Sequence, residues 1–230
     1  MVRRAGTVAG AGLLLMAMLA LFAQFGVLER LVSEGDATKT ARDVLDSETL
    51  FQFGVVCLAL VAVLDVVVAW ALLVFFRPVH EGVALLAALF RVAYAGVFLA
   101  AIGQLAGVVP LLGDTERLAA YGPHRLNSDA LLKITSFSDI WSVGLILFGV
   151  HLILLGYLAY ASGRMPRLIG ALLAVAGLGY LVDSLGLLLD PEYSADVARF
   201  TAVGEVVLMV WLLVKGRTSA PGPRQRPPGP

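Results

Sequence analysis

The sequence predicts an all-α fold: a polytopic membrane protein with a six-transmembrane antiparallel helix bundle and both termini in the cytoplasm. Hydrophobic residues make up 59% of the 230 positions and charged residues only 15%, whereas a typical soluble domain has about 25% charged residues. Six segments are long and apolar enough to cross a hydrocarbon core, which takes about 20 residues in a helix. The uneven distribution of bases along the chain predicts the orientation.

The six predicted spans lack the polar and apolar alternation of a membrane β-strand, so each is expected to be a helix. They cover residues 5–28, 50–76, 83–109, 137–161, 168–189 and 195–214. Bases precede the first span, as in a secretion signal, but its apolar run is longer than the roughly 7 to 15 residues of such a signal. We therefore expect this span to be retained.

Two parts of the chain are distinguished by composition. Residues 1–215 form the predicted transmembrane domain, and residues 216–230 form a tail rich in Pro, Gly and Arg. The tail has no apolar face to bury, so we expect it to be disordered in the cytoplasm.

The loops that are predicted to face inward are short and basic. They contain one acidic residue, Glu81. Their basic residues are Arg3, Arg4, Arg77, Arg164, Arg167, Lys215, Arg217, Arg224 and Arg226. The opposite loops are longer and mix bases with acids, so the positive-inside rule places both termini in the cytoplasm. The excess of Arg over Lys and the lack of sorting motifs are typical of a protein of a bacterial plasma membrane.

The two long outer loops are expected to have some structure of their own. Residues 29–49 mix charged and polar side chains, which indicates a partly helical surface segment. In the loop 110–136, Tyr121-Gly122-Pro123 signals a turn, and Asn127 or Ser128 is the predicted N-cap of the helix that leads into the fourth span.

Five ionisable residues lie deep inside the predicted spans, where each charge costs about 2.5 to 3.5 kcal/mol. They are Asp65, Arg91, His151, Asp183 and Glu205. At 1.5 Å per residue, four of them share one layer about 12 to 16 Å from the inner helix ends, while Asp183 lies nearer the outer side. A shared central layer predicts that these side chains pair with one another.

Arg91 is a permanent cation with a rigid donor fork, so Asp65 or Glu205 is its expected partner. The other carboxylate then faces His151, and Tyr94, one turn from Arg91, is placed to join the same cluster. Three functions fit such a buried polar cluster. It fixes the helices of a structural or partner-binding membrane protein, it carries proton-linked transport of a small solute, or it supplies acid, base and ligand groups to an intramembrane enzyme.

Several other functions lack their sequence patterns. No H-x-x-x-H or H-E-x-x-H spacing occurs, and the only cysteine, Cys57, rules out an internal disulfide and a cysteine metal cluster. There is no phosphate-binding loop and no basic, aromatic surface for nucleic acid. We therefore predict no catalytic residues, no cofactor and no metal. The expected partners are the lipid bilayer and a small solute or proton, and the oligomeric state stays open.

Short motifs along almost the whole chain resemble, in order and spacing, a bacterial integral-membrane family known as domain of unknown function 4386. They are SETLF at 47–51, LDVVVA at 64–69, RPV at 77–79, ALFRV at 88–92, FGVHL at 148–152, GYLVDS at 179–184, and GE at 204–205 ahead of WLLVKG at 211–216. The resemblance implies a multi-pass membrane architecture and leaves the activity open.

Overall fold

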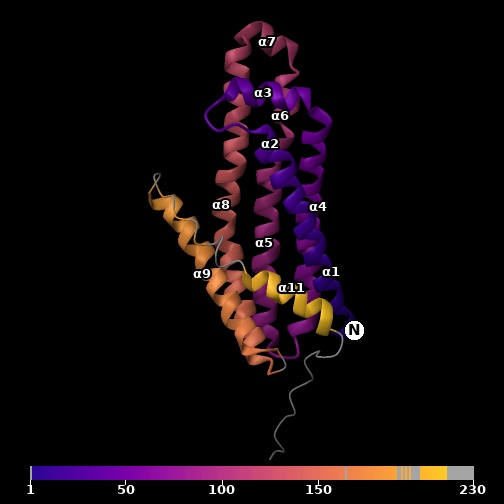
Figure 1. Ribbon diagram of the computed structural model, residues 1–230. Helices are drawn as coiled ribbons and strands as arrows, with labels where there is room; N and C mark the ends of the chain where they lie inside the picture. The colour runs from indigo at the N-terminus through magenta and orange to yellow at the C-terminus, as the bar shows by residue number, and fades with distance from the viewer. Residues whose placement is uncertain are drawn as a thin grey trace, which may run out of the picture. The chain divides into compact units, whose positions relative to one another are not determined.

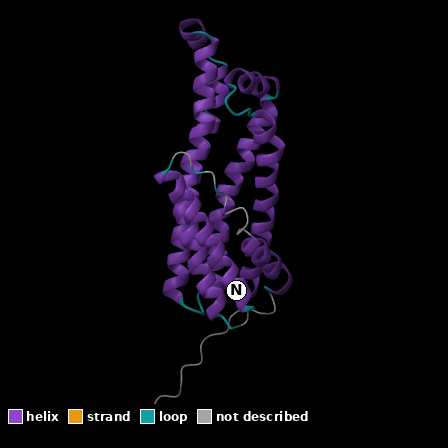
Figure 2. Ribbon diagram, turned by 60° about the vertical axis from the view of Figure 1, so that its left-hand side comes forward, coloured by secondary structure: helices purple, strands orange, loops and turns teal. Residues whose placement is uncertain are grey.

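The computed structural model describes residues 2–163, 165–190, 193, 195, 197 and 203–216. Within these residues every regular element is a helix (Figure 2). The all-α prediction is therefore confirmed. The predicted disordered tail lies, apart from Gly216, outside the described residues.

The helices follow one another with short connections (Figure 1). They are α1 (Val2–Leu21), the π-helical segment η1 (Phe22–Leu28), α2 (Glu29–Leu31), α3 (Ala37–Asp46), α4 (Glu48–Phe76), α5 (Glu81–Ala106), α6 (Val108–Leu112), α7 (Thr115–Tyr121), α8 (Pro123–Ala161), α9 (Arg167–Leu189) and α11 (Val203–Lys215). Among the residues that the structure describes, five helical runs are long and apolar enough to cross a membrane: Arg4–Leu31, Glu48–Phe76, Glu81–Leu112, Pro123–Ala161 and Arg167–Leu189. These runs contain the first five predicted spans completely, and they give the chain the character of a multi-pass membrane protein.

The sixth predicted span, 195–214, is described mainly as α11. This helix has 13 described residues, which extend over about 20 Å, less than the roughly 30 Å of a hydrocarbon core. Residues 198–202 lie outside the described part of the chain. In Figure 1 α11, in yellow, runs across the direction of residues 81–95 of α5. The number of six spans and the cytoplasmic termini therefore remain predictions.

The chain divides into two compact units. The first contains Met1–Leu14, Leu64–Ala95 and Val143–Pro230, and the second contains Leu15–Val63 and Gly96–Ser142. The long helices α4, α5 and α8 each contribute a segment to both units. Asp65, Arg91, His151, Asp183 and Glu205 all belong to the first unit, so this unit holds the candidate site.

The second unit contains the two segments that were expected to be outer loops. The side chain of Asp36 accepts a hydrogen bond from the backbone N–H of Lys39 at 2.8 Å and caps α3, so the predicted helical segment is confirmed. The predicted N-cap at Asn127 or Ser128 is wrong, because α8 already begins at Pro123. Gly122 adopts φ 77°, which glycine allows at no steric cost, and proline is favoured in the first turn of a helix.

In the first unit, α8 and α9 approach so closely that backbone touches backbone. A Cβ atom on Gly177 would lie 2.5 Å from the carbonyl oxygen of Gly149, and one on Gly156 would lie 2.6 Å from that of Gly170. Only glycine fits at such positions. This close approach sets the distance between the side chains that α8 and α9 present to each other.

Candidate functional site

Asp65 of α4 and Arg91 of α5 form a buried ion pair in the first unit. The Nη2 atom of Arg91 lies 2.7 Å from Oδ1 of Asp65. The two residues are only 1% and 2% exposed. A charge-assisted contact of this length between a guanidinium and a carboxylate is among the stronger polar interactions in proteins. The sequence suggested Asp65 or Glu205 as the partner of Arg91, and in the structure the partner is Asp65.

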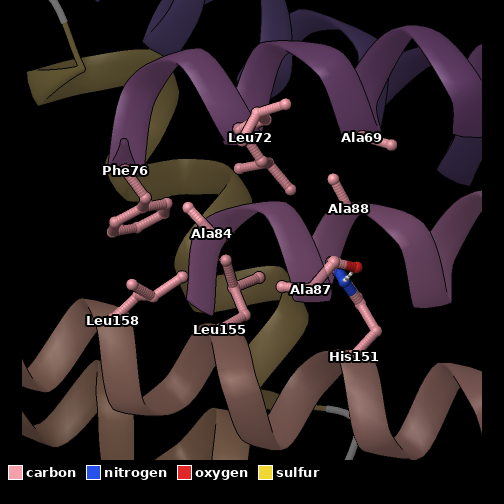
Figure 3. A pocket seen from close by; sticks show the side chains of 10 residues that line it. Ala69, Leu72, Phe76, Ala84, Ala87, Ala88, His151, Leu155 and Leu158 are labelled. Carbon is pink, nitrogen blue, oxygen red and sulfur yellow. Dashed lines mark hydrogen bonds between the residues drawn. The ribbon is translucent and has the colours of Figure 1, made fainter. Parts of the chain in front are cut away.

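His151 of α8 completes the site from a third helix. Its Nε2 lies 3.3 Å from Nη1 of Arg91. Its Nδ1 lies 2.8 Å from the carbonyl oxygen of Ala87 (Figure 3). A carbonyl only accepts and a guanidinium only donates, so Nδ1 carries the hydrogen and Nε2 accepts. In this arrangement the imidazole is neutral. We name Asp65, Arg91 and His151 the ionic cluster.

The second carboxylate oxygen of Asp65, Oδ2, has fewer polar contacts than Oδ1. Within the described residues Oδ2 has no hydrogen-bond partner, although its side chain is buried. The contact of Oδ1 with Arg91 is therefore the main compensation for removing this carboxylate from water. Without Arg91, Asp65 would be a buried anion with no cation beside it.

Aromatic rings cover one side of the ionic cluster. The ring of Phe148 lies 5.4 Å from Cζ of Arg91 and 5.7 Å from the ring of His151. Tyr94 is buried and its ring lies 4.9 Å from that of Phe148. Sequence reasoning named Tyr94 and missed Phe148, which lies three residues before His151 and hence on the same face of α8.

Glu205 of α11 takes a different partner from the one expected. Its Oε1 accepts a hydrogen bond of 2.9 Å from the hydroxyl of Tyr180 on α9, whereas the sequence placed the second carboxylate against His151. The ring of Tyr180 lies 5.5 Å from that of Phe148. Phe148 therefore stands between the ionic cluster and the Tyr180–Glu205 pair. Tyr180 was missed because a tyrosine in an apolar span gives no distinct signal.

Asp183 of α9 binds two of the described residues that follow this helix, Tyr193 and Val197. Its Oδ1 accepts hydrogen bonds from the Tyr193 hydroxyl at 2.7 Å and from the backbone N–H of Val197 at 3.1 Å. The hydrogen bond to Asp183 raises the pKa of Tyr193 above its usual value, and burial of the phenol adds to the effect. The ring of Tyr193 also covers Gly186, where a Cβ would lie 2.6 Å from it.

A small cavity lies next to His151 (Figure 3). Its volume is about 10 Å³, and apart from His151 it is lined by apolar side chains such as Leu72, Phe76 and Leu155. A cavity of this size is at the lower limit for one water molecule. It is too small for a solute, so the ionic cluster is closed on the side that faces this cavity.

The described residues contain no group of three or more His, Cys, Asp or Glu side chains that could hold a metal ion. Cys57 is a buried free thiol of α4. The chemistry that the ionic cluster offers is therefore that of one cation, one anion and one neutral imidazole held together among helices.

The comparison with known families identifies the chain. The family model described as Domain of unknown function (DUF4386) matches residues 8–216. The chain belongs to this family. An uncharacterized protein of Archaeoglobus fulgidus is 36% identical over 165 residues, which are 72% of this chain and 85% of that protein. No solved structure matches the chain. The predicted family is confirmed, and its description assigns no activity.

Proposed function

We propose that this chain is a structural or partner-binding protein of the bacterial plasma membrane, in which the ionic cluster holds the helices in a fixed arrangement. The observation that carries this proposal is that Asp65, Arg91 and His151 come from three different helices, are all buried, and are joined through the guanidinium of Arg91. Interhelical polar contacts inside a membrane hold helices together at one rotation and one depth.

The ionic cluster fixes the helices because Arg91 of α5 has one partner on α4 and another on α8. A charge in a low-dielectric interior is costly unless it is paired and hydrogen-bonded. Arg91 uses Nη2 for Asp65 of α4 and Nη1 for His151 of α8. Sliding or turning any one of the three helices would break one of these contacts and expose an uncompensated charge to an apolar medium.

The proposed topology has six spans with both termini in the cytoplasm. Five long apolar helices support it, and the sixth span is proposed from the apolar sequence of residues 195–214. Arg77 follows the end of α4, Arg167 opens α9 and Lys215 closes α11. In a six-span topology these three bases face the same side, which the positive-inside rule makes the cytoplasm.

A flux assay tests the structural role. We expect purified protein in liposomes to dissipate a pH gradient no faster than protein-free liposomes of the same lipid. The assay is run in parallel on the parent, on Glu205→Gln and on His151→Ala. A parent flux above the protein-free rate that either variant abolishes, in protein that is still folded, would overturn the proposal.

Glu205 favours a second candidate function, proton-linked transport of a small solute. The carboxylate of Glu205 is hydrogen-bonded to Tyr180 inside a predicted span, and the ring of Phe148 contacts both Tyr180 and the ionic cluster. A carboxylate within a span is a suitable proton carrier in a membrane protein. The same liposome assay separates the two functions, since transport requires that Glu205→Gln abolish the flux.

A further inference from the structure

Arg91 of α5 lies near two carboxylates that come from different helices. Asp65 of α4 is its partner, with Oδ1 at 2.7 Å from Nη2 of Arg91. Glu205 of α11 is the second carboxylate, and it lies close enough for the charges of Arg91 and Asp65 to act on it. A guanidinium binds the carboxylate of an aspartate and that of a glutamate by the same hydrogen bonds. The choice of Asp65 therefore comes from the surroundings of Arg91.

The ring of Phe148 lies between Arg91 and the residue that binds the second carboxylate. Its centre is 5.4 Å from Cζ of Arg91 and 5.5 Å from the ring centre of Tyr180. The Tyr180 hydroxyl in turn donates a hydrogen bond of 2.9 Å to Glu205. The face of an aromatic ring attracts a cation, but its carbon atoms offer no ordinary hydrogen bond. Phe148 therefore holds the guanidinium at its face and gives it no polar contact toward Glu205.

The side chain of Phe148 is held in this position by its neighbours. It is buried, and the rings of Tyr94 and His151 lie 4.9 and 5.7 Å from its own. The next residue, Gly149, is in backbone contact with α9, because a Cβ on it would lie 2.8 Å from the carbonyl oxygen of Gly177. Since packed interiors leave little free space, the ring moves only if these side chains or the two helices shift.

We propose that the ring of Phe148 selects the partner of Arg91. The ring keeps the guanidinium on Asp65 and stops it from reaching Glu205. Exchange of Arg91 between the two carboxylates then requires displacement of the ring. The inference does not depend on the choice between the two candidate functions. In a structural protein the ring stabilises one arrangement of the charges, and in a transporter it is the barrier to their exchange.

Asp65→Asn makes the selection measurable, because it removes the anion beside Arg91. Glu205→Gln is the probe, since the amide removes the charge and keeps an oxygen that accepts from the Tyr180 hydroxyl. The unfolding equilibrium constant in one detergent is measured for the parent, for each single variant and for the double variant. With Phe148 in place we expect the two effects to multiply to within about twofold, because Arg91 does not reach Glu205.

The same set of proteins is then made with Phe148→Ala. In this background the guanidinium is free to turn to Glu205 once Asp65 is neutral. Glu205→Gln should therefore raise the unfolding equilibrium constant about tenfold more in the Asp65→Asn protein than in the protein that keeps Asp65, because it breaks a hydrogen bond between charged groups. If Phe148→Ala does not fold, Phe148→Leu takes its place, since it also removes the ring and leaves a smaller cavity.

Phe137→Ala is the matched control for the cavity that the loss of a ring leaves. Phe137 is also a buried ring of α8, but it belongs to the second unit and packs against Phe98 and Trp141. Its removal leaves Phe148 in place, so the effects of Asp65→Asn and Glu205→Gln should still multiply in this background.

Three outcomes would overturn the proposal. Coupling of about tenfold with Phe148 in place would show that Arg91 reaches Glu205 past the ring. Multiplicative effects after removal of the ring would show that another feature keeps the two side chains apart. Equal coupling in the Phe137→Ala and Phe148→Ala proteins would assign the effect to a general loosening of the helices.

Discussion

Two carboxylates of the first unit, Asp65 and Glu205, lie in helices where a charge is costly, yet they are stabilised in different ways. Asp65 is 1% exposed and pairs with the guanidinium of Arg91. Glu205 is half-buried and accepts a hydrogen bond from the neutral hydroxyl of Tyr180. A carboxylate removed from water needs a cation or a hydrogen-bond donor in its place, and Asp65 has the cation whereas Glu205 has only a neutral donor.

The comparison predicts its largest effect at Arg91. Arg91→Leu leaves Asp65 as a buried carboxylate without a cation, so we expect the free energy of unfolding to fall by about 3 to 5 kcal/mol. Denaturant or thermal unfolding of the detergent-solubilised protein measures this loss. As a control, Arg77→Leu breaks the exposed Arg77–Glu81 pair, for which a change below about 1 kcal/mol is expected. Equal stability of the two variants would contradict the account.

A smaller effect is expected where α8 and α9 bring Phe148 and Tyr180 together. Gly177→Ala places a methyl group 2.5 Å from the carbonyl oxygen of Gly149, which forces the two helices apart at an expected cost of about 1 to 3 kcal/mol. Gly96→Ala in α5 meets nothing within 4 Å and should stabilise the protein by about 0.5 to 1 kcal/mol. The same unfolding measurement compares them, and a stabilising Gly177→Ala would argue against the close approach.

Tyr180→Phe tests the weaker of the two carboxylate environments. It removes the hydrogen bond to Glu205 and keeps the ring against Phe148, so the expected loss is about 1 kcal/mol. This is well below the loss in Arg91→Leu. If Tyr180→Phe proved as damaging as Arg91→Leu, Glu205 would be as dependent on its partner as Asp65, and the distinction between the two environments would fail.

The smallest effect concerns Asp183, a third carboxylate of the first unit. Its hydrogen bond raises the pKa of Tyr193, so this tyrosine should ionise above the usual value near 10, and Asp183→Asn should bring the ionisation back toward that value. A raised pKa in the folded state means that the hydrogen bond contributes fully below the unfolded pKa and is lost as the pH rises through the folded one. Tyrosinate absorbance of the parent minus that of Tyr193→Phe measures the shift. An unshifted ionisation would rule out the hydrogen bond.

The sequence predicts the helices of this chain better than the partners of its buried charges. Hydropathy locates the five long apolar runs, because the length of such a run is a direct requirement of the bilayer. Depth along each helix also brings Asp65, Arg91 and His151 to one level. Depth does not give the rotation of a helix about its axis, and rotation decides that Arg91 takes Asp65 and that Glu205 turns to Tyr180.

Other differences have similarly local causes. The start of α8 was expected several residues late because Asn127 and Ser128 are good N-cap residues, whereas Gly122 and Pro123 already begin the helix. The sequence did not predict that Phe148 contacts the ionic cluster, because one phenylalanine among many apolar residues is not distinguished by any sequence pattern. Its position depends on the contact of α8 with α9 at Gly149 and Gly177, which is a property of the packed pair.

The central claim is that Asp65 and Arg91 stabilise the helices as a pair, and a double-mutant cycle tests it most directly. The unfolding free energies of the parent, Asp65→Leu, Arg91→Leu and the double variant are measured in the same detergent. We expect each single variant to lose about 3 to 5 kcal/mol and the double variant to lose clearly less than the sum, because two leucines leave no buried charge. A loss in the double variant equal to the sum of the two single losses would contradict the pairing.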